Sequence, residues 1–271
     1  MKVKIIGAGV WSRGLTSFAE LCASLATAEL AGPSEFPPPK PEAIPARERR
    51  RAGLMINLAV TAAHQACEHA AVDKAQVPSI FTSCMGDTDI TDYMCRKLAQ
   101  PEKLLSPTKF HNSVHNAPSG YWTISASNRT PSSFVGGGEY SFGLGLLEAA
   151  STCLACNAPV LLVAYDIANS QPFADILPVT ETFASALVLA PETHADGADL
   201  GVAVELSTEQ NSAVDTPRHS ALRALANANP SAQSLTLLEA LAEIHTGSQD
   251  HAQITLAAGA DLRLTIQAGT I

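Results

Sequence analysis

The sequence predicts an α/β layered fold with a mixed sheet, and two observations carry this prediction. Segments typical of strands and of helices alternate along the chain, and adjacent strands follow toward the C-terminus. Several strands are short apolar runs, as expected for strands that are buried on both faces. With 271 residues, 46% of them apolar, the chain is long enough for one large domain or two small ones.

The first half of the chain contains the clearer helix signals. In order, the predicted elements are a strand at 2–7, a helix within 15–30, an amphipathic helix at 54–71, a strand at 78–84 and a helix at 89–98. Residues 32–45 hold six prolines, and residues 106–120 include Pro107 and Pro118. Both segments are therefore expected to be loops.

The second half contains more strands. A strand at 133–138 runs into a helix that begins near Tyr140. The elements predicted after it are strands at 159–166, 184–190 and 200–206, a helix at 234–245, and strands at 253–257 and 262–267. The pattern is sparse past residue 207.

Charge limits the classes of partner. The formal net charge is −9 and charged residues make up 16% of the chain. An acidic chain is a poor match for nucleic acid or an anionic membrane surface. A surface with few charges is typical of one that a partner covers. The apolar runs predict no membrane span and no signal peptide, so a cytoplasmic location is expected.

The six cysteines are expected to be free. Cys153 and Cys156 have the C-x-x-C spacing of redox and zinc sites, but they fall inside the helical run 149–158 with no second pair nearby. We interpret them as structural residues.

Gly7-Ala8-Gly9 resembles the start of a dinucleotide-binding loop. That fingerprint requires a third glycine where this chain has Ser12, and the prolines from Pro33 onward interrupt the region of its acidic residue. The plainer interpretation is a tight turn after the first strand, with no bound nucleotide.

Two further motifs have structural interpretations that are simpler than metal binding. Asp87, Asp89 and Asp92 lack the glycine and distal glutamate of a calcium loop, and acidic residues favour the first turn of a helix. His111 and His115 have zinc-like spacing, but flanking prolines and asparagines predict a buried polar loop with no third ligand. We therefore expect no metal and no cofactor.

A hydrolase elbow is also disfavoured. Ser141 lies in Glu-Tyr-Ser-Phe-Gly, which resembles G-x-S-x-G, but Glu139 replaces the first glycine.

Five segments in order give the chain a family resemblance. They are Ile5-Ile6-Gly7-Ala8-Gly9-Val10, the arginine run 47–51, Thr82-Ser83-Cys84-Met85-Gly86-Asp87, the loop 112–122 and the strand, turn and helix of 133–149. Together they resemble the N-terminal half of β-ketoacyl synthases, the thiolase-fold condensing enzymes. The resemblance covers about residues 1–207. It implies a thiolase-like layered fold with a complete N-terminal half and a truncated C-terminal half, in which residues 208–271 are an abbreviated part that completes the same globule.

The departures from the family concern catalysis. Alignment of the helix places Glu139 where the family has its nucleophilic cysteine, and a carboxylate cannot hold an acyl group as a reactive thioester. The two histidine motifs, H-G-T-G-T and N-H-x-F-G-F, do not occur, and His219, His245 and His251 have no such surroundings. The chain is therefore not expected to be an enzyme by itself.

The resemblance implies a short subunit that lacks the nucleophilic cysteine and is akin to the chain length factors of bacterial aryl-polyene pathways. Such a subunit is non-catalytic, pairs with an active ketosynthase as a heterodimer or heterotetramer, and shapes the acyl or polyene tunnel in which a chain grows on an acyl carrier protein. The complex would be a β-ketoacyl-ACP synthase, an acyltransferase of fatty-acid or polyketide biosynthesis. The candidate pocket or interface residues are Phe110, His111, Asn112, His115, Asn116, Phe134, Glu139, Tyr140 and Phe142.

Two alternatives stay open. Glu139 could act as a base that decarboxylates a carrier-bound malonyl group and so primes the chain. The protein could instead be a homodimeric acyl-binding protein without a ketosynthase partner.

Overall fold

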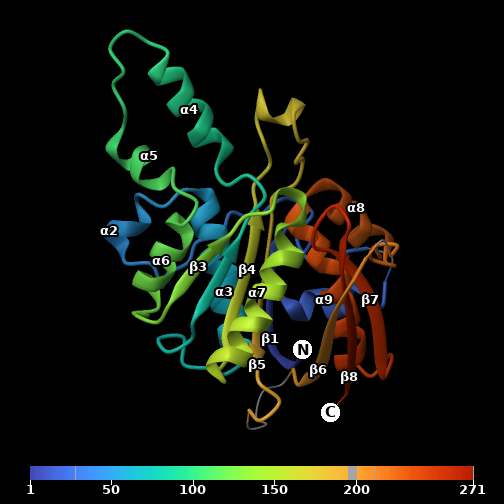
Figure 1. The fold of residues 1–271 in the computed structure, drawn as a ribbon. Helices are drawn as coiled ribbons and strands as arrows, with labels where there is room; N and C mark the ends of the chain where they lie inside the picture. Colours follow the sequence, from blue (N-terminus) through green and yellow to red (C-terminus); the bar gives the residue numbers. More distant parts are fainter. Residues whose placement is uncertain (28, 195–199, 211, 271) are drawn as a thin grey trace.

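One mixed sheet organises the molecule. The computed structural model describes residues 1–27, 29–194, 200–210 and 212–270. Within these residues, eight strands hydrogen-bond in the order β3-β2-β4-β5-β1-β6-β8-β7 (Figure 1). The predicted α/β fold with a mixed sheet is confirmed.

The elements have the following bounds. The strands are β1 Lys2–Ser12, β2 Ser79–Thr82, β3 Ser132–Val135, β4 Val160–Asp166, β5 Phe183–Ala190, β6 Val202–Gln210, β7 His251–Ala257 and β8 Leu262–Thr270. The α-helices are α1 Phe18–Ser24, α2 Ala46–Arg49, α3 Leu54–His69, α4 Thr88–Leu98, α5 Pro107–Asn112, α6 Ala117–Ser125, α7 Ser141–Cys156, α8 Ser220–Ala228 and α9 Leu235–His245. The 3-10 helices are η1 Gly138–Tyr140, η2 Phe173–Asp175 and η3 Pro230–Ser234.

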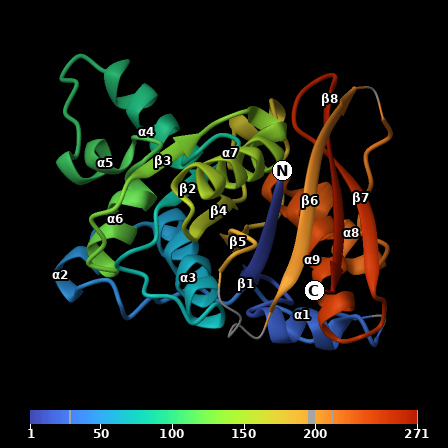
Figure 2. The ribbon, with the colours of Figure 1, turned by 60° about the horizontal axis from the view of Figure 1, so that its bottom comes forward.

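Helices α7 and α3 lie on opposite faces of the middle of the sheet (Figure 2). β2 runs parallel to β3 and β4, whereas β5 is antiparallel to both β4 and β1. Every residue of β4 and β5 is buried. On one face Leu162 and Leu187 belong to the core that includes α7 and α9, and on the other Leu161 and Val188 pack with α3 and α6. Two hydrophobic cores thus lie back to back across the sheet.

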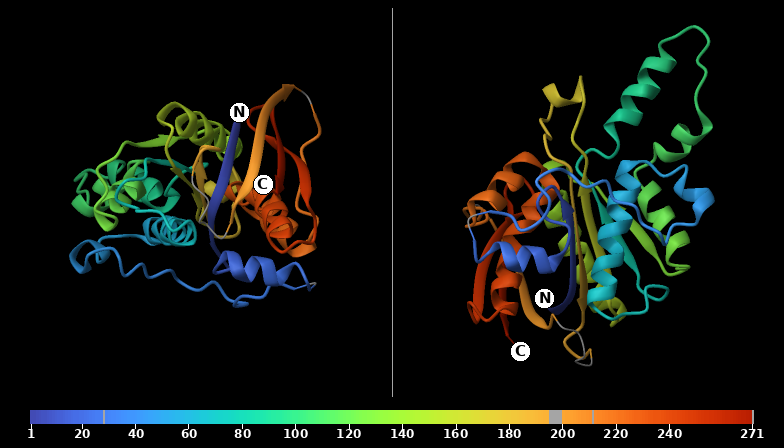
Figure 3. Two further views of the ribbon diagram at one scale, coloured as in Figure 1. Left: turned by 90° about the horizontal axis from the view of Figure 1, so that it is seen from below. Right: turned by 180° about the vertical axis from the view of Figure 1, so that it is seen from behind.

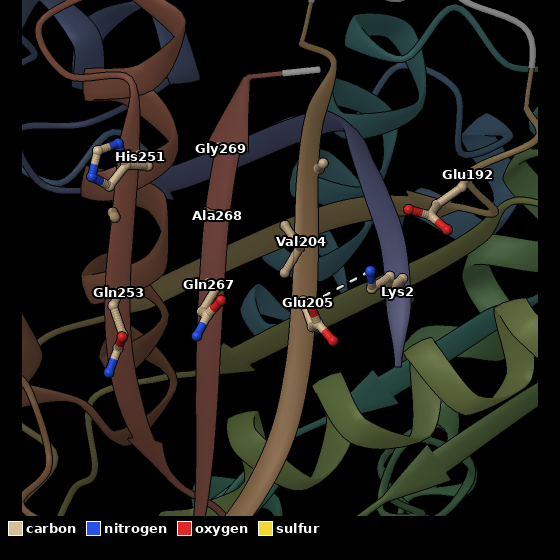
Figure 4. Close-up of a pocket in the computed structure, with 11 residues that line it drawn as sticks. Lys2, Glu192, Val204, Glu205, His251, Gln253, Gln267, Ala268 and Gly269 are labelled. Carbon is tan, nitrogen blue, oxygen red and sulfur yellow. Dashed lines mark ion pairs between the residues drawn. The ribbon is translucent and has the colours of Figure 1, made fainter.

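The last three strands in sheet order, β6, β8 and β7, are covered on one face. Val202, Val204 and Leu206 of β6 point into the core with α9, whereas the intervening Glu205 and Ser207 are exposed. Figure 4 shows the outer face, where Lys2, Glu205, Gln267 and Gln253 lie on neighbouring strands beside a groove of about 420 Å³. This alternation is typical of an antiparallel sheet with one solvated face.

The predicted domain boundary falls within β6, which runs across residue 207. Residues beyond it contribute α9, β7 and β8 to the same sheet and core. The division into 1–207 and 208–271 itself stays a prediction.

The glycines of Gly7-Ala8-Gly9 lie inside β1, so the predicted tight turn is wrong. A Cβ at Gly7 would lie 2.3 Å from the Ala66 carbonyl oxygen, and one at Gly9 would lie 2.5 Å from that of Ala62. The strand continues because glycine lets α3 approach its backbone closely.

The unpaired edges of the strands differ in the groups that hydrogen-bond to them. β1 pairs with β6 over Lys2–Ile5; beyond that, the Ala8 and Val10 amides donate to His69 Nδ1 (3.2 Å) and Gln65 Oε1 (3.0 Å). At the β7 edge, the Thr255 amide donates to Asp215 Oδ2 at 2.8 Å, and the Asp215 amide donates to the Thr255 carbonyl at 2.9 Å. At the opposite edge, β3 pairs with β2 and with no other strand among the described residues.

The predicted loop at 106–120 is wrong, because it contains α5 and the start of α6. Pro107 and Pro118 each lie in the first turn of one of these helices, where a missing amide hydrogen costs nothing. With α4, α5 forms an arm that projects from the body of the molecule, as Figure 3 shows. The segment that contains η2 projects at the same end (Figures 1 and 3).

α8 was not expected from the sequence, and it packs against η3 near the strand ends. Among the helices of the described residues, none is long and apolar enough to cross a membrane.

Candidate functional site at the turn between β3 and α7

A short turn carries Glu139 from β3 into α7. Gly138 has a φ of +58°, a conformation that favours glycine, and η1 follows at once. The Glu139 side chain is exposed. The Tyr140 hydroxyl donates to the Glu139 carboxylate, and this bond, together with the Glu139 charge, raises the pKa of Tyr140.

Ser141 fixes the turn to the end of β2. Its buried Oγ accepts from the Gly137 amide at 2.9 Å and lies 2.6 Å from the Gly138 carbonyl oxygen, to which it can donate. Thr82 Oγ1 in turn donates to the Ser141 carbonyl at 2.9 Å. Ser141 is thus a structural residue of the turn, and its hydroxyl is engaged rather than presented to a substrate.

Cys84 follows β2 and lies near the turn. Burial, followed by the charges of Asp166 and Glu139, raises the pKa of the Cys84 thiol from 9.0 to about 12. A thiol with this pKa is protonated at neutral pH, and the thiol form is a poor nucleophile.

A buried carboxylate joins the ends of β2 and β4 to η3. Asp166 accepts hydrogen bonds from Ser83 Oγ at 2.7 Å, from the Cys84 amide at 2.9 Å and from Ser231 Oγ at 2.6 Å. Asn229 Nδ2 donates to the Asp166 backbone carbonyl at 3.0 Å. Burial raises the pKa of Asp166 despite these donors. Sequence reasoning missed this cluster, although a lone aspartate that ends an apolar strand was a visible signal.

The structure brings His115 and Phe134 together. Their rings stack with centroids 5.1 Å apart at 23°, and the Tyr165 hydroxyl donates to the His115 carbonyl at 3.4 Å. Asn112 is buried, donates to the Arg51 carbonyl at 2.8 Å and accepts from Tyr121.

The remaining candidates are dispersed. Phe142 is buried in the core beneath the turn, whereas Phe110, His111 and Asn116 are exposed on or beside α5. The role of the nine candidates in a pocket or interface stays a prediction.

The histidine, aspartate and cysteine motifs lie in surroundings that fit structural roles. α5 ends at Asn112, so one helix does not carry both His111 and His115. Asp87 caps α4 by accepting from the Ile90 amide at 2.9 Å, which confirms the helix-start interpretation. Both cysteines of the C-x-x-C lie in α7 and are free. The described residues contain no group of three histidine, cysteine or acidic side chains placed to hold a metal ion.

Four cavities of about 280 to 460 Å³ lie away from the turn, and Glu139 lines none of them. The one of about 460 Å³ lies between α1, α3 and α9, beside Phe18, His69 and His245. The candidate site is therefore a turn on the end of the sheet, with its surroundings fixed by buried polar contacts.

Comparison with known proteins identifies the family. The profile of the β-ketoacyl synthase N-terminal domain matches residues 25–257. The chain belongs to this family. The predicted resemblance to β-ketoacyl synthases and the thiolase-like fold are confirmed.

Similar solved structures include ketosynthase complexes. A chain of the ketosynthase ApeO in complex with its chain length factor ApeC, from Xenorhabdus doucetiae, is 25% identical, with a TM-score of 0.68 over 98% of this chain and 99% of that one. The ishigamide ketosynthase/chain length factor is 15% identical, with a TM-score of 0.74 and 100% of both chains covered. AntDE:AntF, a type II acyl carrier protein in complex with its ketosynthase, is 12% identical, with a TM-score of 0.74 over 100% of this chain and 99% of that one. No curated protein matches the chain.

Proposed function

We propose that the chain is a non-catalytic, chain-length-factor-like subunit that pairs with an active β-ketoacyl-ACP synthase and shapes its acyl or polyene elongation tunnel. One observation carries the proposal. The turn between β3 and α7 presents the carboxylate of Glu139, and the adjacent Cys84 keeps its thiol protonated.

The chemistry of condensation explains why a protonated Cys84 thiol supports the proposal. Claisen condensation by these synthases needs a thiolate that accepts the acyl group and donors that stabilise the developing oxyanion or enolate. With a pKa of about 12, about one Cys84 thiol in 10⁵ is ionised at pH 7. The Ser141 hydroxyl is engaged within the turn. A partner subunit would therefore supply the nucleophile.

Two surfaces support pairing with a ketosynthase. The outer edge of β3 has no partner strand among the described residues, and an unpaired edge can accept a strand from another subunit. The nearby arm exposes large apolar side chains: Leu98 is 50% exposed, Leu104 69% and Phe110 60%. Several large apolar side chains exposed on one arm are typical of a surface that a partner covers.

The distribution of charge supports an acyl carrier protein as a further partner. Residues 47–51 and 96–109 hold eight of the 17 lysines and arginines but two of the 26 acidic residues. The two segments belong to one corner, because Asn112 at the end of α5 donates to the Arg51 carbonyl. A basic corner on an otherwise acidic chain suits an acidic carrier protein.

Co-expression tests the proposed role. We expect the chain to co-purify with a full-length ketosynthase encoded next to it and to give one heteromeric mass by native mass spectrometry. The ketosynthase alone should make shorter products or make them more slowly. Full-length product at full rate from the ketosynthase alone would overturn the role, and a homodimer in its presence would favour the acyl-binding alternative.

The exposed Glu139 carboxylate, which accepts from Tyr140, favours priming by decarboxylation as a second candidate. Under the first proposal, Glu139→Ala and Glu139→Gln lower condensation by the complex by less than about tenfold, because no transition-state contact above about 1.4 kcal/mol is lost. The assay measures product formation by the co-purified complex. Release of CO₂ from malonyl-carrier by the purified chain, abolished in Glu139→Gln, would instead support the decarboxylase.

A further inference from the structure

The turn between β7 and β8 lies directly against the first turns of α7. A Cβ placed at Gly143 would lie 2.2 Å from the Ala257 carbonyl oxygen and 3.1 Å from Ala258 Cα. The two backbones therefore touch where glycine leaves room. A change in the position of either segment must be transmitted to the other, because no side chain separates them.

One guanidinium closes this turn. Arg263 Nη1 donates to the carbonyls of Gly259, Ala260 and Leu262 at 2.9, 3.0 and 3.1 Å. Its Nε donates to the Ser212 carbonyl at 3.0 Å, which ties down the segment that follows β6. The planar, always charged guanidinium suits several carbonyls at once, whereas the ammonium of lysine is a compact point charge.

The charge of Arg263 also acts across the contact. Glu139 raises the pKa of Tyr140, and the charge of Asp261 raises it further. The charge of Arg263 lowers it. The β7–β8 turn thus interacts with the start of α7 in two ways, through charge and through the close contact at Gly143.

We propose that Arg263 is a positioning residue: by holding the β7–β8 turn closed against Gly143, it fixes the start of α7 and therefore the place of Glu139. Resting on the proposed function, this assigns Arg263 a part in setting the chain length that the complex produces. Glu139, Tyr140 and the β7–β8 turn would then move or stay fixed as one surface beside the growing chain.

Arg223 provides a matched control. Its Nε donates to the Pro217 carbonyl at 2.8 Å and its Nη2 to the Arg218 carbonyl at 2.6 Å, so it also braces backbone. These carbonyls precede α8 and do not belong to the β7–β8 turn. Loss of Arg223 should therefore loosen a different part of the molecule.

Hydrogen exchange read by mass spectrometry tests the positioning without any partner. In Arg263→Ala, amides in 138–146 should exchange at least about tenfold faster than in the wild type. Arg223→Ala should leave those amides unchanged, and Arg263→Lys should fall between Arg263→Ala and the wild type. Faster exchange in 258–262 with unchanged exchange in 138–146 would overturn the proposal.

A second variant keeps the test decisive if Arg263→Ala fails to fold. Gly143→Ala pushes the turn away from the other side while Arg263 stays intact. The same amides in 138–146 should then exchange faster, and unchanged exchange in both Gly143→Ala and Arg263→Lys would overturn the proposal.

Product analysis tests the functional part. In complexes with the neighbouring ketosynthase, Arg263→Ala should shift the distribution of product lengths while Arg223→Ala leaves it as in the wild type. An unchanged distribution from an intact Arg263→Ala complex would overturn the role in chain length. Failure of the wild-type chain to bind any ketosynthase would instead count against the proposed function and leave the exchange result standing.

Discussion

Two parts of one sheet differ in how they are covered. β4 and β5 are buried at every residue between α7 on one face and α3 on the other. Over 202–207 of β6, buried residues alternate with more exposed ones, and the outer face of β6, β8 and β7 is polar. A strand buried on both faces is largely apolar along its length, whereas a strand buried on one face is apolar at every second residue. The sequence of each strand therefore reports how many layers lie on it.

The covered part also depends on close backbone contact. At Gly7 and Gly9 the backbones of β1 and α3 lie too close for a side chain, whereas no helix of the described residues covers the outer face of β6, β8 and β7. Substitutions that add or remove volume should thus act strongly in one part and weakly in the other.

The largest expected effect is at Gly7. In Gly7→Val the side chain would collide with the Ala66 carbonyl and with Ala70, so we expect a loss of at least about 3 kcal/mol in the free energy of unfolding. Urea unfolding followed by circular dichroism measures it. Gly120→Ala is the control, because no atom lies within 4 Å of a Cβ at this position in α6. That substitution should stabilise the protein by about 0.5–1 kcal/mol, and equal destabilisation by both variants would contradict the contact.

A smaller contrast compares the two parts of the sheet. Leu187 of β5 is 1% exposed, so Leu187→Ala should cost about 2–5 kcal/mol through lost burial and the cavity left behind. Gln267 of β8 points outward, and Gln267→Ala should change the free energy of unfolding by less than about 0.5 kcal/mol. The same urea titrations give both values. A cost at Gln267 comparable to that at Leu187 would mean that the outer face is covered.

Much of the fold could be predicted because burial leaves a pattern. The runs at 159–166 and 184–190, apolar except at Asp166 and Ser185, correspond to β4 and β5. The prediction was wrong where one residue type is compatible with two structures. Pro107 and Pro118 indicate loops unless they fall in the first turn of a helix, and glycines indicate turns unless, like Gly7, they admit a neighbouring helix.

The candidate site divides in the same way. Resemblance to the family turn predicts Glu139, and its role stays a prediction. The contacts of Asp166 with Ser83 and Ser231 could not be predicted, because they join residues far apart in sequence. No local periodicity encodes such contacts; they arise when the strand ends meet.

A last expected effect concerns Cys84, at the end of the covered part, where burial controls ionisation. With a pKa of about 12 instead of 9.0, Cys84 has about 10³-fold less thiolate than an ordinary thiol at pH 7. Iodoacetamide at pH 7 should therefore label the exposed Cys95 and Cys156 and leave Cys84 largely unmodified, as peptide mass spectrometry would measure.

The pH dependence gives a second check on Cys84. Labelling should accelerate about tenfold per pH unit while the pH stays below about 12, because the thiolate fraction rises in proportion. Glu139→Gln removes one of the charges that raise the pKa and should speed labelling slightly. Complete labelling of Cys84 at pH 7 within the time needed for Cys95 would contradict the protonated thiol.

The hydrogen bonding at the strand edges affects how the chain behaves without a partner. Side chains of α3 occupy the amides of β1 beyond Ile5, and Asp215 occupies the edge of β7. These contacts block strand pairing at Ala8, Val10 and Thr255. β3 has no such guard among the described residues, and its edge amides can seed intermolecular pairing. Without its partner, the purified chain should therefore self-associate through β3 and become less soluble as its concentration rises.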